Sequence, residues 1–189
     1  MLGYEHPGGL GDLLNKGTGE LTAQSLEGDL IRHQSGISLL MASPTPDPSE
    51  STFSPETAGS LVRRLSEAVD YLVLDLGNGL SPAVESLAPL SSHLILCLEP
   101  HRVAVALAQE MISALNDLGL GPRSIHPALI NRTPSGLQMS WQAVQQTLQK
   151  NILAIVSPAP ELAYQALESQ AAMIQLQPGS ITSGQFRKL

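Results

Sequence analysis

The 189-residue sequence has little of what several classes of protein need. Cys97 is its single cysteine, so no disulfide can form within one chain. It stands inside an apolar run, which predicts a buried, reduced thiol. The five histidines show no metal-ligand spacing, and we expect no metal cluster. No apolar run approaches the roughly 18 residues of a membrane span, and residues 1–7 lack the features of a signal peptide. These absences favour a cytoplasmic protein.

Basic residues are also scarce. Lys and Arg number 10 against 17 Asp and Glu, so the net charge is −7 and the pI is about 5.1. Broad nucleic-acid binding needs clustered positive charge, and we therefore expect no direct nucleic-acid partner. Hydrophobic residues make up 42% of the chain, which is long enough to form one domain with a real core.

Strand and helix patterns alternate along most of the chain. Strands separated by helices of 10–17 residues are typical of βαβ units. The sequence thus predicts an α/β fold with a mostly parallel sheet and flanking helices. We expect Pro127 at the start or edge of its strand and Trp141 in the core. The expected helices cover 10–14 (closed by Gly17), 21–33, 55–69 (capped by Ser54), 102–118, 141–148 (capped by Ser140) and 162–167, and the expected strands cover 36–42, 70–76, 94–98, 128–130 and 152–156.

Residues 70–79 are the stretch around which we expect the fold to be organised. An apolar run leads into Asp75 and is followed by Gly77 and Gly79. Such a run suits a strand buried on both faces, with a carboxylate at the sheet edge where parallel sheets bind ligands. The glycines allow a sharp turn and a close approach to a ligand. The alternative is that Asp75 only caps the next helix. The residues alone do not decide between a ligand-binding and a capping role for this aspartate.

Five segments of the chain carry a resemblance to one known family: Asp75 to Gly79, Ser91 to Pro100, Leu129 to Arg132, Val156 to Glu161 and Pro178 to Ser180. In this order they resemble motifs of the MinD/ParA group of P-loop ATPases, and most of all of its CpaE-like pilus-assembly members. Asp75 to Gly79 resembles the second switch of that family, Asp-x-Pro-x-Gly, with Gly77 in place of proline. Each motif alone is a weak signal. Together the motifs are spread over most of the chain, and their order and spacing make the resemblance more specific.

The resemblance implies a P-loop NTPase-like fold with ATP and magnesium as cofactors. The implied function is a cytoplasmic nucleotide switch in pilus assembly or in cargo and chromosome positioning, with peripheral membrane association through a partner. In this family Asp75 would orient magnesium and water, and Gly77 and Gly79 would belong to the switch. Asn131 would contact adenine, with Arg132, Pro158 and Ala159 beside the base. A turn role for Asn131, a solvated Arg132 and a purely structural loop at Pro158 remain alternatives.

The sequence departs from the family at its start. The family opens with a strand and a loop of the form Lys-Gly-Gly-x-Gly-Lys-Ser/Thr, which cradles the phosphates. No such loop occurs here, and Gly8 to Gly11 is interpreted as a turn. We expect one domain, residues 1–189, incomplete at its N-terminus, in which a missing strand either leaves neighbouring backbone unpaired or forces the sheet to close up.

Three expectations follow from this departure. ATP should bind weakly or not at all, unaided hydrolysis should not occur, and the chain should self-associate or need a protein partner. Two accounts stay open. The chain is either a fragment or mis-started product of an active ATPase, or a non-catalytic scaffold derived from this fold.

Overall fold

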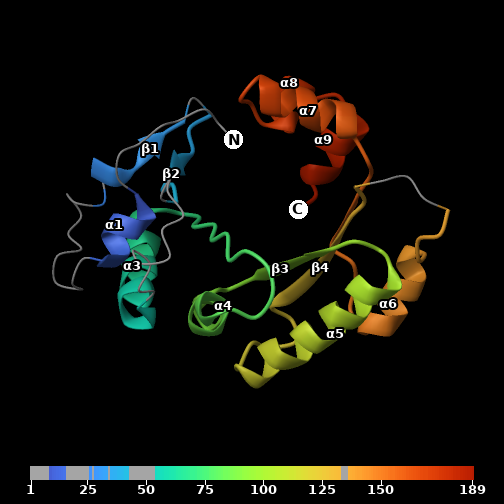
Figure 1. Ribbon diagram of the computed structural model, residues 1–189, viewed down its shortest axis with the longest axis horizontal. Helices are drawn as coiled ribbons and strands as arrows, with labels where there is room; N and C mark the ends of the chain where they lie inside the picture. The colour runs from blue at the N-terminus through green and yellow to red at the C-terminus, as the bar shows by residue number, and fades with distance from the viewer. Residues whose placement is uncertain (1–8, 16–25, 27, 34, 43–53, 133–135) are drawn as a thin grey trace. The chain divides into compact units, whose positions relative to one another are not determined.

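A computed structural model describes the chain apart from residues 1–8, 16–25, 27, 34, 43–53 and 133–135 (Figure 1). The chain divides into two compact units, and the boundary lies between Leu90 and Ser91. Each unit is described by itself. In the described part of the chain, no helix is both long and apolar enough to cross a membrane.

The unit from Ser91 to Leu189 is built on a three-stranded parallel sheet of order β3-β4-β5. Its register pairs Leu94 with Ile125 and Ala128 with Ala154. Helices connect successive strands, as parallel pairing requires, and the expected α/β class with flanking helices is confirmed (Figure 1). The elements are β3 (Leu94–Leu98), α5 (Arg102–Asp117), β4 (Ile125–Ile130), α6 (Trp141–Leu148), β5 (Ala154–Val156), α7 (Pro160–Glu168), α8 (Met173–Leu176) and α9 (Ile181–Phe186).

The core of this unit includes residues of the central strand β4 and of α5. Leu129 on β4 is 1% exposed, and α5 contributes Val105, Ala108, Ile112 and Leu115. The sequence pattern predicts that one face of this helix is in the core, with Val103, Leu107, Met111, Ala114, Leu115 and Leu118. Leu115 is buried as expected, but the prediction is wrong for Val103 and Leu107, whose side chains are 66% and 65% exposed.

Pro127 also differs from expectation, because it is buried within the central strand and not at an edge. The physical reason is its position in the ladder. Its carbonyl accepts the Leu153 N–H at 2.8 Å on the β5 side, whereas pairing with β5 begins one residue later, at Ala128. Proline has no backbone N–H. At this position an N–H would lie before the start of the β4–β5 pairing, so its absence removes no hydrogen bond between the strands.

The unit up to Leu90 packs helices around a small leucine cluster. Leu13, Leu26, Leu61 and Leu65 are buried together. The N-caps Ser54 and Ser81 accept backbone N–H groups of Thr57 and Val84, which start two helices at prolines. The elements are α1 (Leu10–Asn15), the antiparallel pair β1 (Ile31–Arg32) and β2 (Ser38–Leu39), α3 (Pro55–Ala68), α4 (Pro82–Leu87) and a short 3-10 helix, η2 (Ala88–Leu90).

Two expectations in this unit are wrong in part. The helix expected over 21–33 does not reach its end, since Ile31–Arg32 forms β1; residues 21–25 and Gly17 lie outside the described residues. The strand expected over 36–42 is reduced to Ser38–Leu39.

Residues 70–76, expected as the buried central strand, do not form one. Among the described residues no strand pairs with this segment, and Tyr71 and Val73 are each 91% exposed. Leu72 packs against the leucine cluster, and Leu74 and Leu76 are half-buried. A strand buried on both faces needs hydrogen-bonding neighbours. Without such neighbours the apolar alternation buries only every second side chain.

Candidate functional site

The candidate site of the Ser91–Leu189 unit lies where its three parallel strands end. Glu99 follows β3, Asn131 follows β4 and Ser157 follows β5. Neighbouring parallel strands bring their carboxyl ends to one edge of the sheet, which is where open α/β sheets bind ligands. Four of the residues selected from the sequence therefore lie after adjacent strands: Asn131, Arg132, Pro158 and Ala159.

Asn131 has the most unusual environment at this edge. Its backbone N–H donates to the Val156 carbonyl at 2.9 Å, which extends the β4–β5 pairing by one residue. Its side-chain Oδ1 is buried, and within the described residues it has no hydrogen-bond partner. A buried acceptor left unpaired costs about 1–3 kcal/mol. A donor for this atom therefore lies outside the described residues, and both the adenine contact and the turn role of Asn131 remain predictions.

Arg132 reaches across to the end of the neighbouring strand. Its Nε donates to Glu99 Oε1 at 2.7 Å, and its guanidinium forms an ion pair with the same carboxylate. The Arg132 side chain is 77% exposed, so this pair contributes no more than about 1 kcal/mol to stability. Its effect is positional, because it directs the guanidinium toward the end of β3.

The loop after β5 is held by a residue that the sequence analysis did not select. Gln185 Oε1 accepts the Ser157 N–H at 2.8 Å, and Gln185 Nε2 donates to Ser157 Oγ at 2.9 Å. This two-point contact from α9 fixes the start of the loop that carries Pro158 and Ala159, both half-buried. No local signal marks Gln185, because its partner lies 28 residues away. Ser180, the last residue of the Pro178 to Ser180 segment, caps its helix by accepting the Ser183 N–H.

The remaining selected residues, Asp75, Gly77 and Gly79, lie in the other unit. Asp75 is exposed, and its Oδ1 accepts the Gly77 N–H at 3.0 Å. Gly77 and Gly79 have φ values of 74° and 71°, a left-handed conformation that glycine adopts without strain. The helix-cap alternative for Asp75 is wrong, because Ser81 caps the next helix. Its carboxylate instead closes a tight turn.

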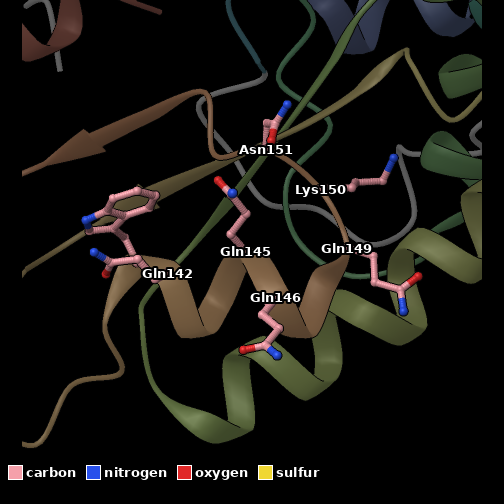
Figure 2. A pocket seen from close by; sticks show the side chains of 7 residues that line it. Gln142, Gln145, Gln146, Gln149, Lys150 and Asn151 are labelled. Carbon is pink, nitrogen blue, oxygen red and sulfur yellow. The ribbon is translucent and has the colours of Figure 1, made fainter.

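Two further expectations about side chains are wrong. Cys97 is exposed and not buried, although the partial burial of its thiol raises its pKa. Trp141 is 46% exposed rather than a core anchor, and it lines an open hollow of about 440 Å³ with four glutamines of α6 and the loop that follows (Figure 2). In that hollow Gln145 Oε1 accepts the Ile152 N–H, and Lys150 Nζ donates to the Pro122 carbonyl. The hollow thus has no acid–base pair for catalysis.

Comparison with family models gives no match, and neither does comparison with curated proteins. Solved structures do match. A ParA family ATPase from Chlorobium tepidum TLS has a TM-score of 0.85 at 16% identity, over 97% of this chain and 75% of that one. MinD complexed with Mg-ADP from Pyrococcus horikoshii OT3 has a TM-score of 0.81 at 20% identity, over 99% and 74%.

A MinC:MinD cell division complex from Aquifex aeolicus is also similar, with a TM-score of 0.74 at 16% identity, over 90% of this chain and 68% of that one. Identities this low establish the fold alone. The chain has the α/β fold of the ParA and MinD ATPases, which is the P-loop NTPase-like fold that the sequence motifs predict.

Proposed function

We propose that this chain is a MinD/ParA-like positioning protein of the CpaE-like branch, acting in the cytoplasm in pilus assembly or in cargo and chromosome positioning. We propose further that the polypeptide, folded as one functional domain over residues 1–189, does not hydrolyse ATP unaided. The observation that carries the proposal is the buried Oδ1 of Asn131 at the sheet edge, which has no hydrogen-bond partner among the described residues. In this fold that edge is where a nucleotide would bind.

The described residues fit the base of a nucleotide better than its phosphates. Asn131 Oδ1 would accept a hydrogen bond from the exocyclic amine of adenine, and Pro158 and Ala159 would flank the base. Arg132 is held by Glu99 on the β3 side of the same edge. For the phosphates, the sequence contains no Lys-Gly-Gly-x-Gly-Lys-Ser/Thr loop. Because charge-assisted bonds to phosphate are the strong ones, we infer that the base contacts alone give weak binding.

Magnesium and a reactive water would belong to Asp75 by analogy with the family. Its Oδ1 is already engaged by Gly77 N–H, so metal binding would compete with the turn. The similar MinD structure holds Mg-ADP, which supports nucleotide and magnesium as the ligands of the fold. With no phosphate loop in the sequence, Gly77 and Gly79 would act as a switch only if a partner supplied that loop.

The test compares adenosine with Mg-ATP in ligand-observed NMR and calorimetry. Adenosine and Mg-ATP should bind weakly and with similar affinity, because the sequence has no loop that would bind the phosphates. Asn131→Leu should abolish the adenosine signal, whereas Asn151→Leu, at an exposed position outside this edge, should leave it unchanged. A micromolar dissociation constant for Mg-ATP, or ATP turnover by the purified chain, contradicts the proposal. Absence of adenosine binding contradicts the base site and leaves the scaffold alternative.

The second candidate function is a non-catalytic scaffold that retains the interaction surfaces of this fold. The similar MinC:MinD complex supports a protein partner, and such a partner would also provide any peripheral membrane association. A partner that binds equally well with adenosine, ATP or neither, and equally well to Asn131→Leu, would favour the scaffold over the nucleotide switch.

A further inference from the structure

Two histidines meet at the end of the sheet opposite Asn131. His93 immediately precedes β3, and His126 is the second residue of β4. Their ring nitrogens, Nδ1 of His93 and Nε2 of His126, lie 3.0 Å apart. The ring centroids are 5.2 Å apart and the rings are tilted by 45°. The two imidazoles thus face each other through one ring nitrogen each.

The neighbouring strands hold this arrangement in place. His126 pairs in register with Ile95, two residues after His93, so the histidines are diagonal neighbours on one face of the ladder. Between them the Leu94 N–H donates to the Ser124 carbonyl at 2.7 Å, which fixes the separation of the two backbones beside the pair. A site carried by paired strands is pre-organised, and little conformational entropy is lost when a ligand binds.

The geometry is close to that of two nitrogen ligands on one metal ion. With Zn–N bonds of about 2.05 Å and a tetrahedral angle, two such ligands lie ~3.3 Å apart. The observed 3.0 Å separation needs an adjustment of only ~0.3 Å. As the pair stands, one ring donates its N–H to the lone pair of the other. If that proton moves to the far nitrogen of the same ring, each of the two facing nitrogens has a lone pair available for a metal ion.

We propose that His93 Nδ1 and His126 Nε2 together bind a divalent transition-metal ion, with zinc as the reference case and water in the remaining coordination positions. Imidazole is a preferred ligand for zinc, copper and nickel. His93 is exposed and His126 half-buried, so solvent reaches the site. Within the described residues no cluster of three or more His, Cys, Asp or Glu could hold a metal. The site is therefore open and binds more weakly than a four-ligand structural zinc site.

The other described histidines are not arranged in this way. His33 is buried, and its Nδ1 accepts the Ser35 N–H and contacts the Ser35 hydroxyl. His101 caps α5, and its Nδ1 accepts the Ala104 N–H. Only His93 and His126, of the histidines in the described ranges, have facing ring nitrogens. The inference does not depend on the proposed nucleotide function, since its residues lie at the other end of the strands.

The test titrates the full chain with Zn²⁺ in calorimetry. One site should be seen, and His93→Gln and His126→Gln should each weaken it at least about tenfold, because each removes one of two protein ligands. His101→Asn is the matched control, since asparagine also caps helices, and its zinc affinity should be unchanged. Circular dichroism checks that every variant folds.

A second measurement locates the ion directly. In two-bond ¹H–¹⁵N spectra of the imidazoles, zinc should shift Nδ1 of His93 and Nε2 of His126 and leave the rings of His33 and His101 unshifted. Zinc binding that survives both Gln substitutions, ring shifts at other histidines only, or no zinc binding by the folded chain would each overturn the proposal.

Discussion

Truncation of Leu129 to alanine tests the core of the Ser91–Leu189 unit. Leu129 is 1% exposed and lies in the central strand, between Leu98 on β3 and Ile155 on β5. Leucine-to-alanine changes at fully buried sites lose the transfer free energy of the removed atoms and leave a cavity, at a cost of about 3–5 kcal/mol. The strands on both sides limit collapse into the cavity, so we expect the free energy of unfolding to fall by an amount within that range.

Urea unfolding followed by fluorescence measures the loss. Trp141 is the single tryptophan of the chain and belongs to the same unit. With an m value of about 2 kcal/mol/M, the urea midpoint should fall by ~1.5–2.5 M. Leu107→Ala is the matched control, because Leu107 is 65% exposed, and surface changes shift stability by no more than about 0.5 kcal/mol. A Leu129→Ala loss below about 1 kcal/mol would refute the placement of Leu129 in a close-packed core.

Three other outcomes are expected. Cys97 should react with a thiol reagent in the folded chain because it is exposed. Near neutral pH the reaction should be slower than that of a free cysteine, because the raised pKa of the thiol lowers the thiolate fraction. A reaction rate at or above that of the unfolded chain would contradict this. Duplex DNA should not bind in a salt-dependent manner, since the net charge is −7, and a tight complex in a low-salt gel shift would be the contrary result. Light scattering should show self-association that does not depend on ATP. The reason is that alternate backbone groups of β3 face away from β4, and among the described residues no strand lies beside them. A monomer at every concentration, or a dimer only with ATP, would count against this prediction.

Local signals in the sequence predict most helices well. Ser54 and Ser140 are the N-caps expected for α3 and α6, and each accepts the N–H group three residues ahead. The same holds for strand ends followed by proline or asparagine, since β3 spans the expected residues 94–98. These features depend on residues within one turn or one strand end, and the neighbouring sequence contains all of that information.

The inward face of α5 depends on more distant residues. Both of its stripes are apolar, one through Val105 and Ile112 and the other through Val103 and Leu107. The helical periodicity does not tell which of the two stripes faces inward, because either stripe would bury a continuous row of apolar side chains. The choice falls to the packing of the helix on β3, which buries the first stripe and leaves the second in solvent.

The candidate site shows the same division. Asn131 and the Pro158–Ala159 loop follow strand ends, so the sequence could place them at one sheet edge. Asn131 Oδ1 has no partner among the described residues, and Gln185 holds Ser157 by two hydrogen bonds. Both features depend on contacts across the fold, which no motif encodes. The His93–His126 pair was missed for the same reason, since spacing along the chain gives no sign of a 33-residue contact.

Residues 70–77 show most clearly why an apolar pattern does not by itself make a strand. The run has the composition of a buried strand, and Leu72, Leu74 and Leu76 do turn inward. A helix satisfies its own backbone, whereas a strand depends on neighbours for every N–H and C=O. In the described structure no strand offers those groups to this segment, so Tyr71 and Val73 remain in solvent. The alternation therefore predicts which side chains face inward correctly, while the strand itself depends on backbone from elsewhere in a sheet.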